Sequence, residues 1–202
     1  MQVHEAIEKR RSIRKFADEP VSRDEIMQLL EAARLAPSAM NAQPWRFKIV
    51  DGKEDIQWLS GSPTRGQKWV AGAGAVLVCC ADITRFLEDA RAAVRFLRDS
   101  AVLPPEMQAG VEDYVEKAQN SPTEILRGAV GMNCSIALTH IMLRATEMDL
   151  GTCWIGMYDE EALRQRFNLP QQAAVMALLA VGRPAESPEP RPRKAMEEII
   201  LD

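Results

Sequence analysis

The sequence predicts a single domain that combines helices with β-strands. Its 202 residues are enough to enclose one hydrophobic core, and no internal repeat or low-complexity segment divides the chain. Hydrophobic residues make up 47% and charged residues 27% of the chain, which is typical of soluble globular proteins. Short β-rich runs lie between longer segments whose apolar residues have helical spacing. These observations predict one mixed domain over residues 1–202.

The N-terminal part is predicted to contain two helices. Residues 3–10 place their apolar side chains on one face of a short amphipathic helix, and the run Lys9–Lys15 then contains five basic residues in seven. Ser22 and Glu25 have the spacing of a capping box, so a second helix is predicted from there to about Ala36.

A polar loop, Pro37–Trp45, follows the second helix. Its two prolines fix their own φ angles and push the preceding residues out of the helical region. The loop therefore offers Ser, Asn and Gln side chains outward. Together with the basic run, it is interpreted as a cofactor seat.

The rest of the chain alternates between strands and helices. Strands are predicted at 46–50, 75–81, 152–156 and 173–181. Helices are predicted at 53–60, 82–103, 106–119 and 159–167, with a long core helix that starts at Ser121. The glycines before the second strand are not a dinucleotide fingerprint, because they precede the strand and the third glycine is missing.

Two segments are predicted to lie outside the hydrophobic core. The helical excursion 82–120 matches no motif, and we expect it to form a lid or a wall on the substrate side. After Gly182, closely spaced prolines predict a stiff extended arm, and residues 195–201 are expected to add an edge strand.

The charge and the cysteines limit the kinds of partner. A net charge of −4 and a pI of about 5.4 give no reason to expect nucleic acid or an anionic membrane. No N-terminal apolar run resembles a signal peptide, and the longest apolar runs are shorter than a membrane span, so a cytoplasmic protein is expected. The four cysteines lack metal-site spacing, so buried reduced thiols and no metal are expected.

The sequence contains no hydrolytic constellation. There is no GxSxG motif, and the chain has only two histidines. Arginines gather instead at both ends of the chain. Planar guanidinium groups suit a bound phosphate, although surface arginines paired with acids would give the same composition.

Four segments together carry a resemblance. They are Arg10–Arg14, Pro37–Trp45, Leu150–Gly156, and the tail from Gly182–Pro184 to Arg191–Lys194. In this order, and over nearly the whole chain, the sequence resembles the nitroreductase family of FMN-dependent oxidoreductases. The resemblance implies an α+β fold with a central, mostly antiparallel sheet flanked by helices. It also implies an intertwined homodimer with FMN at the interface and a swapped C-terminal arm, residues 183–202, that wraps the partner.

The resemblance also implies the parts of a flavin site. The phosphate and ribityl side is implied for Arg10, Arg11, Ser12, Arg191 and Arg193. Arg14 is implied to lie near the pyrimidine N1/O2 edge. The isoalloxazine ring would be lined, from the other subunit, by Pro37, Ser38, Ala39, Asn41 and Gln43. Backbone groups of Trp154, Ile155 and Gly156 would face its N5/O4 side. No catalytic side chain is implied, because the flavin carries the chemistry.

The function implied is that of an NAD(P)H-dependent flavin oxidoreductase. It would work by a ping-pong hydride-transfer cycle and reduce nitroaromatics, quinones or related electrophiles. A nicotinamide donor is favoured because the chain has no cysteine run for a ferredoxin module. The alternatives are an FMN-binding or sensing protein with little turnover, a specialised family activity such as reductive dehalogenation, and a non-flavin scaffold whose arginines contact an acidic partner.

Overall fold

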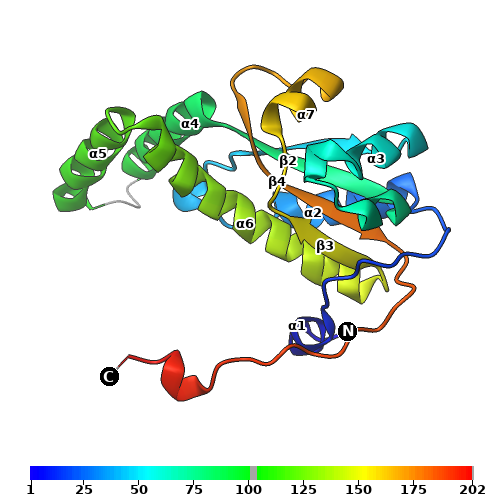
Figure 1. The fold of residues 1–202 in the computed structure, drawn as a ribbon. Helices are drawn as coiled ribbons and strands as arrows, with labels where there is room; N and C mark the ends of the chain where they lie inside the picture. Colours follow the sequence, from blue (N-terminus) through cyan, green and yellow to red (C-terminus); the bar gives the residue numbers. More distant parts are fainter. Residues whose placement is uncertain (101–103, 202) are drawn as a thin grey trace.

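The protein has an α+β fold built on a four-stranded antiparallel sheet (Figure 1). A computed structural model describes residues 1–100 and 104–201. The strands, in the spatial order β1-β2-β4-β3, are β1 Trp45–Val50, β2 Ala75–Asp82, β3 Gly151–Ile155 and β4 Ala173–Gly182. The four predicted strands are confirmed, each to within one residue at either end.

The two central strands are buried on both faces. Alternate residues of β2, such as Leu77 and Val78, point into two separate apolar clusters. One cluster holds the sheet against α2 and α6, and the other holds it against α3 and α7 (Figure 1). This double burial explains why β2 and β4 read as continuous apolar runs, although their pairing is antiparallel.

The helices largely follow the predicted pattern. They are α1 Val3–Lys9, α2 Arg23–Arg34, α3 Lys53–Leu59, α4 Ile83–Asp99, α5 Pro105–Gln119, α6 Thr123–Glu147 and α7 Glu160–Phe167. The predicted capping box is present: the Glu25 amide donates to Ser22 Oγ at 3.2 Å, and the Ser22 amide donates to the Glu25 carboxylate at 2.9 Å. The last part of the predicted 82–103 helix, residues 101–103, lies outside the described residues.

Helix α6 is the core helix that the sequence predicts. One side of it buries Cys134, Leu138 and Ile141 completely against the sheet and α2. By length and composition alone, its stretch Glu124–Glu147 would also be long and apolar enough to cross a membrane. A buried core helix passes the same test of length and composition, so this finding does not contradict the expectation drawn from the apolar runs. Packing against the sheet accounts for the apolar side of the helix.

Two segments project from the sheet and its covering helices. Helices α4 and α5 form a hairpin at the far end of the molecule, beside the N-terminal part of α6 (Figure 1). The second is the C-terminal arm. Its first residues, up to Glu186, contact the body, whereas residues 189–201 are exposed. Its described residues, up to 201, include a 3-10 turn at Met196–Glu198. The predicted edge strand at 195–201 is wrong, because the arm, as far as the structure describes it, pairs with no strand of its own chain.

The four cysteines are buried and free, as expected. The neighbouring Cys134 thiol, together with burial, raises the pKa of Cys79. Burial raises the pKa of Cys80 to about 12. The Cys79 and Cys80 thiols therefore stay protonated at neutral pH and behave as core residues.

Close packing at Gly182 gives a stability prediction. A Cβ added there would lie 2.6 Å from Phe16 Cδ1 and 3.1 Å from the Gly74 backbone nitrogen. We expect Gly182→Ala to lower the free energy of unfolding by about 1–3 kcal/mol through overpacking. Urea denaturation at fixed protein concentration measures the change.

The matched control is Gly128→Ala on helix α6. A Cβ at Gly128 meets no atom within 4 Å. Alanine favours a helix over glycine, so this variant should gain up to about 1 kcal/mol. Equal unfolding midpoints for the two variants would contradict the packing argument.

Candidate active site

The N-terminal basic segment runs along the edge strand β3. Ser12 forms a parallel bridge with Thr152, and the Ile13 amide donates to the Thr152 carbonyl at 2.9 Å. A Cβ at Gly151 would come within 2.8 Å of Ile13 Cγ1, so glycine allows this close approach. Two of the four motifs, far apart in the sequence, therefore lie side by side.

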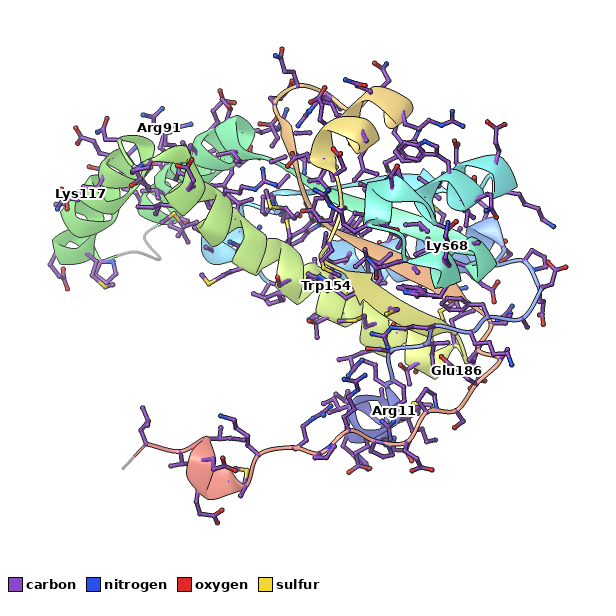
Figure 2. The ribbon with its side chains drawn as sticks, viewed as in Figure 1. Arg11, Lys68, Arg91, Lys117, Trp154 and Glu186 are labelled. Carbon is purple, nitrogen blue, oxygen red and sulfur yellow. The ribbon has the colours of Figure 1, made fainter. Side chains whose placement is uncertain are left out.

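The first residues of the C-terminal segment join the same place. The Ala185 amide donates to the Lys15 carbonyl at 2.9 Å. The Glu186 carboxylate accepts the amides of Arg14 at 2.5 Å and Lys15 at 3.0 Å. Figure 2 shows Glu186 and Arg11 at this end of the molecule, below Trp154. The N-terminal basic segment and the first residues after β4 are thus fastened together beside β3.

Among the residues that the structure describes, the three arginines of this segment have no acidic partners. Within residues 1–100 and 104–201, no carboxylate lies within 4.0 Å of the Arg10, Arg11 or Arg14 guanidinium. By contrast, Arg34 lies 2.7 Å from Glu31, and Arg166 makes two such ion pairs. Unpaired cations gathered on one edge of an acidic protein are the arrangement expected of an anion site.

Electrostatic effects on Cys153 place these charges close to β3. Burial raises the pKa of Cys153; the charges of Arg14 and Arg10 lower it, and that of Glu186 raises it. The Arg14 guanidinium carbon also lies 5.9 Å from the centroid of the Trp69 ring, a cation–π contact. Trp69 belongs to the 3-10 turn Lys68–Gly72, so that turn borders the site as well.

The polar loop lies at the other edge of the sheet. It leads into β1, whereas the basic segment lies along β3, and these are the two outer strands. Pro37, Ala39 and Asn41 are exposed, and Ser38 and Gln43 are half-buried. One chain therefore does not bring the loop and the basic segment together.

The loop is held in an unusual conformation. Met40, Asn41 and Gln43 have φ angles of 51°, 53° and 44°, in the left-handed region that costs non-glycine residues energy. The Gln43 amide donates to Ser38 Oγ at 3.0 Å. Such a conformation persists only where surrounding contacts determine it.

One of these contacts comes from Asn133 of α6. Its side chain is only 5% exposed; its Oδ1 accepts the Ala39 amide at 2.8 Å, and its Nδ2 donates to the Ala129 carbonyl at 2.9 Å. Asn133 was not predicted from the sequence as a site residue. The sequence held one signal for this role: Asn133 is a lone amide side chain among the apolar residues of α6.

The remaining predicted site residues differ in exposure and in position. Trp154 is 37% exposed and Gly156 is exposed, whereas the Ile155 side chain is buried, so any role of Ile155 falls to its backbone. Arg191 and Arg193 lie on the exposed arm, where Arg193 donates to the Arg191 carbonyl at 3.0 Å. Within this chain, no described contact brings them to Arg10. Trp69 and its exposed neighbour Lys68, which Figure 2 labels, were also not predicted from the sequence as site residues.

Comparison with known proteins establishes the family. The model of the Nitroreductase family matches residues 7–183. The chain belongs to the nitroreductase family. A Thermus thermophilus protein named NADH dehydrogenase is 34% identical, over 96% of this nitroreductase-family chain and 92% of its own length.

Two further proteins are similar to this nitroreductase-family chain. The Bacillus subtilis FMN reductase [NAD(P)H] is 31% identical, over 94% of this chain and 68% of its own. A candidate nitroreductase from Exiguobacterium sibiricum, solved in complex with FMN, has a TM-score of 0.80 at 24% identity. That alignment covers 100% of this chain and 97% of the other. The fold is thus nitroreductase-like, as the resemblance implied.

The anchoring role of Asn133 is testable. In Asn133→Ala the Ala39 amide loses its acceptor, and a hydrogen bond of this kind contributes about 0.5–1.5 kcal/mol. We expect the Ala39 amide to exchange with solvent roughly 3–10-fold faster, measured by hydrogen exchange with NMR detection.

Ser135→Ala is the matched control on the same helix. The Ser135 hydroxyl donates only to the Gly131 carbonyl of its own helix, at 2.8 Å. Exchange at Ala39 should therefore stay at the wild-type rate. Equal rates at Ala39 in the two variants would show that Asn133 does not hold the loop.

Proposed function

We propose that the chain is an FMN-dependent oxidoreductase that takes electrons from NADH or NADPH and passes them to nitroaromatics, quinones or related electrophiles. Family membership and the names of the relatives support this proposal. The observation that carries it is the cluster of arginines without acidic partners along β3, next to the exposed backbone at Gly156.

The residues present fit a flavin mononucleotide. Its phosphate needs fixed positive charge. Arg10, Arg11 and Arg14 supply it, and no carboxylate of the described chain lies within 4.0 Å of their guanidinium groups. Its ring needs backbone donors within reach, and the exposed Gly156 lets a ligand approach the chain closely. We assign the phosphate to Arg10 and Ser12, with Arg191 and Arg193 from an arm, and the ribityl or phosphate side to Arg11.

The chain's own groups would position the cofactor and set its charge environment. Bound FMN supplies hydride acceptance and donation. The Arg14 guanidinium, held by Trp69, would stabilise negative charge at the N1/O2 edge of the ring. Backbone groups of Trp154, Ile155 and Gly156 would orient its N5/O4 side. No acid, base or nucleophile from the protein is then required.

We propose that a homodimer completes each site. The loop residues Pro37, Ser38, Ala39, Asn41 and Gln43 lie at the opposite edge of the sheet, so in this proposal they line the flavin held by the other chain. Each chain would be one domain, with residues 183–202 as a swapped arm. Exposed apolar side chains support a covered interface: Met132 on α6, and Met196, Ile199, Ile200 and Leu201 on the arm.

Reduction of the purified protein tests the proposal. After incubation with FMN and removal of the excess, the protein should be yellow. Anaerobic NADH or NADPH should bleach its absorbance near about 450 nm on a catalytic timescale. A colourless protein would contradict flavin binding. A yellow protein that neither donor bleaches would be an FMN-binding protein without this turnover.

The phosphate assignment predicts the effect of Arg10→Ala. Loss of a charge-assisted hydrogen bond should weaken FMN binding by about 1.5–3 kcal/mol. Fluorescence titration of apo-protein with FMN measures the change. Arg34→Ala removes an arginine that is paired with Glu31, and its affinity should stay at the wild-type value. Unchanged affinity in Arg10→Ala would count against the assignment.

The arm assignment predicts the effect of deleting residues 191–202. The deletion keeps Glu186 and its hydrogen bonds but removes both arm arginines and the apolar end. We expect a monomer that retains little FMN, measured by light scattering and flavin content. The double variant Arg191→Gln/Arg193→Gln keeps the apolar end, so it should remain dimeric and bind FMN more weakly. A deleted protein that stays a flavin-loaded dimer would show that the arm is dispensable.

A further inference from the structure

A cavity of about 800 Å³ lies between the polar loop and helix α4. Its walls include Asn41 and Gln43 of the loop, Arg46 at the start of β1, and Phe96 of α4. Its volume is within the range of small-molecule sites. The cavity therefore adjoins the residues proposed to line the flavin, on the side of the α4–α5 hairpin.

An unpacked aromatic ring forms part of the apolar wall. Phe96 is 69% exposed, whereas α4 packs against the core through Phe86. Leu97 and Ala93 lie beside it in the cavity wall. Because Phe96 does not hold α4 in place, its ring is available for stacking against a planar ligand.

Arg46 supplies a fixed positive charge to the same cavity. One of its terminal nitrogens donates to the carbonyls of Gln43 at 3.0 Å and Trp45 at 2.8 Å, which fixes the guanidinium. No carboxylate of the described residues lies within 4.0 Å of it. The acid in the cavity wall, Asp89, lies 3.6 Å from Arg85. The charge of Arg46 is thus free to meet an anion.

We propose that this cavity binds a planar aromatic electron acceptor that carries an anionic group, with the ring against Phe96 and the anion on Arg46. The inference rests on the proposed function, because it places the acceptor beside the flavin. It makes Arg46 a specificity-determining residue. A nicotinamide nucleotide also combines an aromatic ring with anionic phosphates, so the test separates the acceptor from the donor.

Equilibrium binding gives the first measurement. The oxidised FMN-loaded protein is titrated, without any electron donor, with 4-nitrobenzoate and with nitrobenzene, followed by calorimetry. In Arg46→Gln we expect the Kd of 4-nitrobenzoate to rise about 3–10-fold and that of nitrobenzene to stay within about twofold. In Phe96→Ala both should rise by a similar factor of about 2–10.

Arg23→Gln is the matched control. Arg23 is exposed and lies 3.9 Å from Asp51, just after the far end of β1 from Arg46. Its variant should bind both compounds like the wild type. An unchanged ratio of the two Kd values in Arg46→Gln would overturn the proposal.

Half-reaction rates distinguish the donor from the acceptor. Reduction of the flavin by NADH and by NADPH is measured separately from its reoxidation by the two nitro compounds. We expect Arg46→Gln to slow reoxidation by 4-nitrobenzoate selectively at subsaturating concentration. A loss confined to reduction by the nucleotides would overturn the acceptor assignment. If neither nucleotide reduces the wild-type flavin, the proposed function fails. The titration needs no electron donor, so it still tests whether the cavity binds the two nitro compounds as proposed.

Discussion

Strands β2 and β4 pair in the middle of the sheet, from Ala75 opposite Val181 to Asp82 opposite Ala173, and they are covered on both faces. With its centre closed in this way, the sheet leaves only its two outer strands to receive other segments. The basic segment adds to β3, and the polar loop enters β1. The separation of the two motif groups within one chain is thus a direct result of the strand order.

The ionic contacts divide into two kinds. Glu160 lies 2.6 Å from Arg127 and 3.2 Å from Arg164, and it accepts the Val175 amide at 3.0 Å, so α6, α7 and β4 are joined. Burial raises the pKa of Glu160, but its hydrogen bonds and the neighbouring arginines outweigh this effect and hold it below the usual value. These charges are satisfied within the fold. Among residues 1–100 and 104–201, no carboxylate pairs with the guanidinium groups of Arg10, Arg14 or Arg46, and these are the groups proposed to meet ligands.

Local features of the fold could be predicted from the sequence, and long-range contacts could not. The Ser22–Glu25 capping box spans three residues, and the continuous apolar runs of β2 and β4 define those strands by composition. Asn133 holds a residue 94 positions away, and Glu186 holds one 172 positions away. Nothing in the residues around either side chain indicates its partner. The predicted strand at 195–201 failed for the same reason, because a strand needs an edge to pair with.

The placement of the two motif groups on opposite edges has a genetic consequence. In the proposed dimer, each site draws its basic segment from one chain and its polar loop from the other. A chain with a defective basic segment and a chain with a defective loop would then complement each other when co-expressed, because the mixed dimer retains one complete site. Two chains with the same defect would retain none. Whether a cell retains activity would therefore depend on which two variants of the chain it expresses, although a single gene encodes every residue of the site.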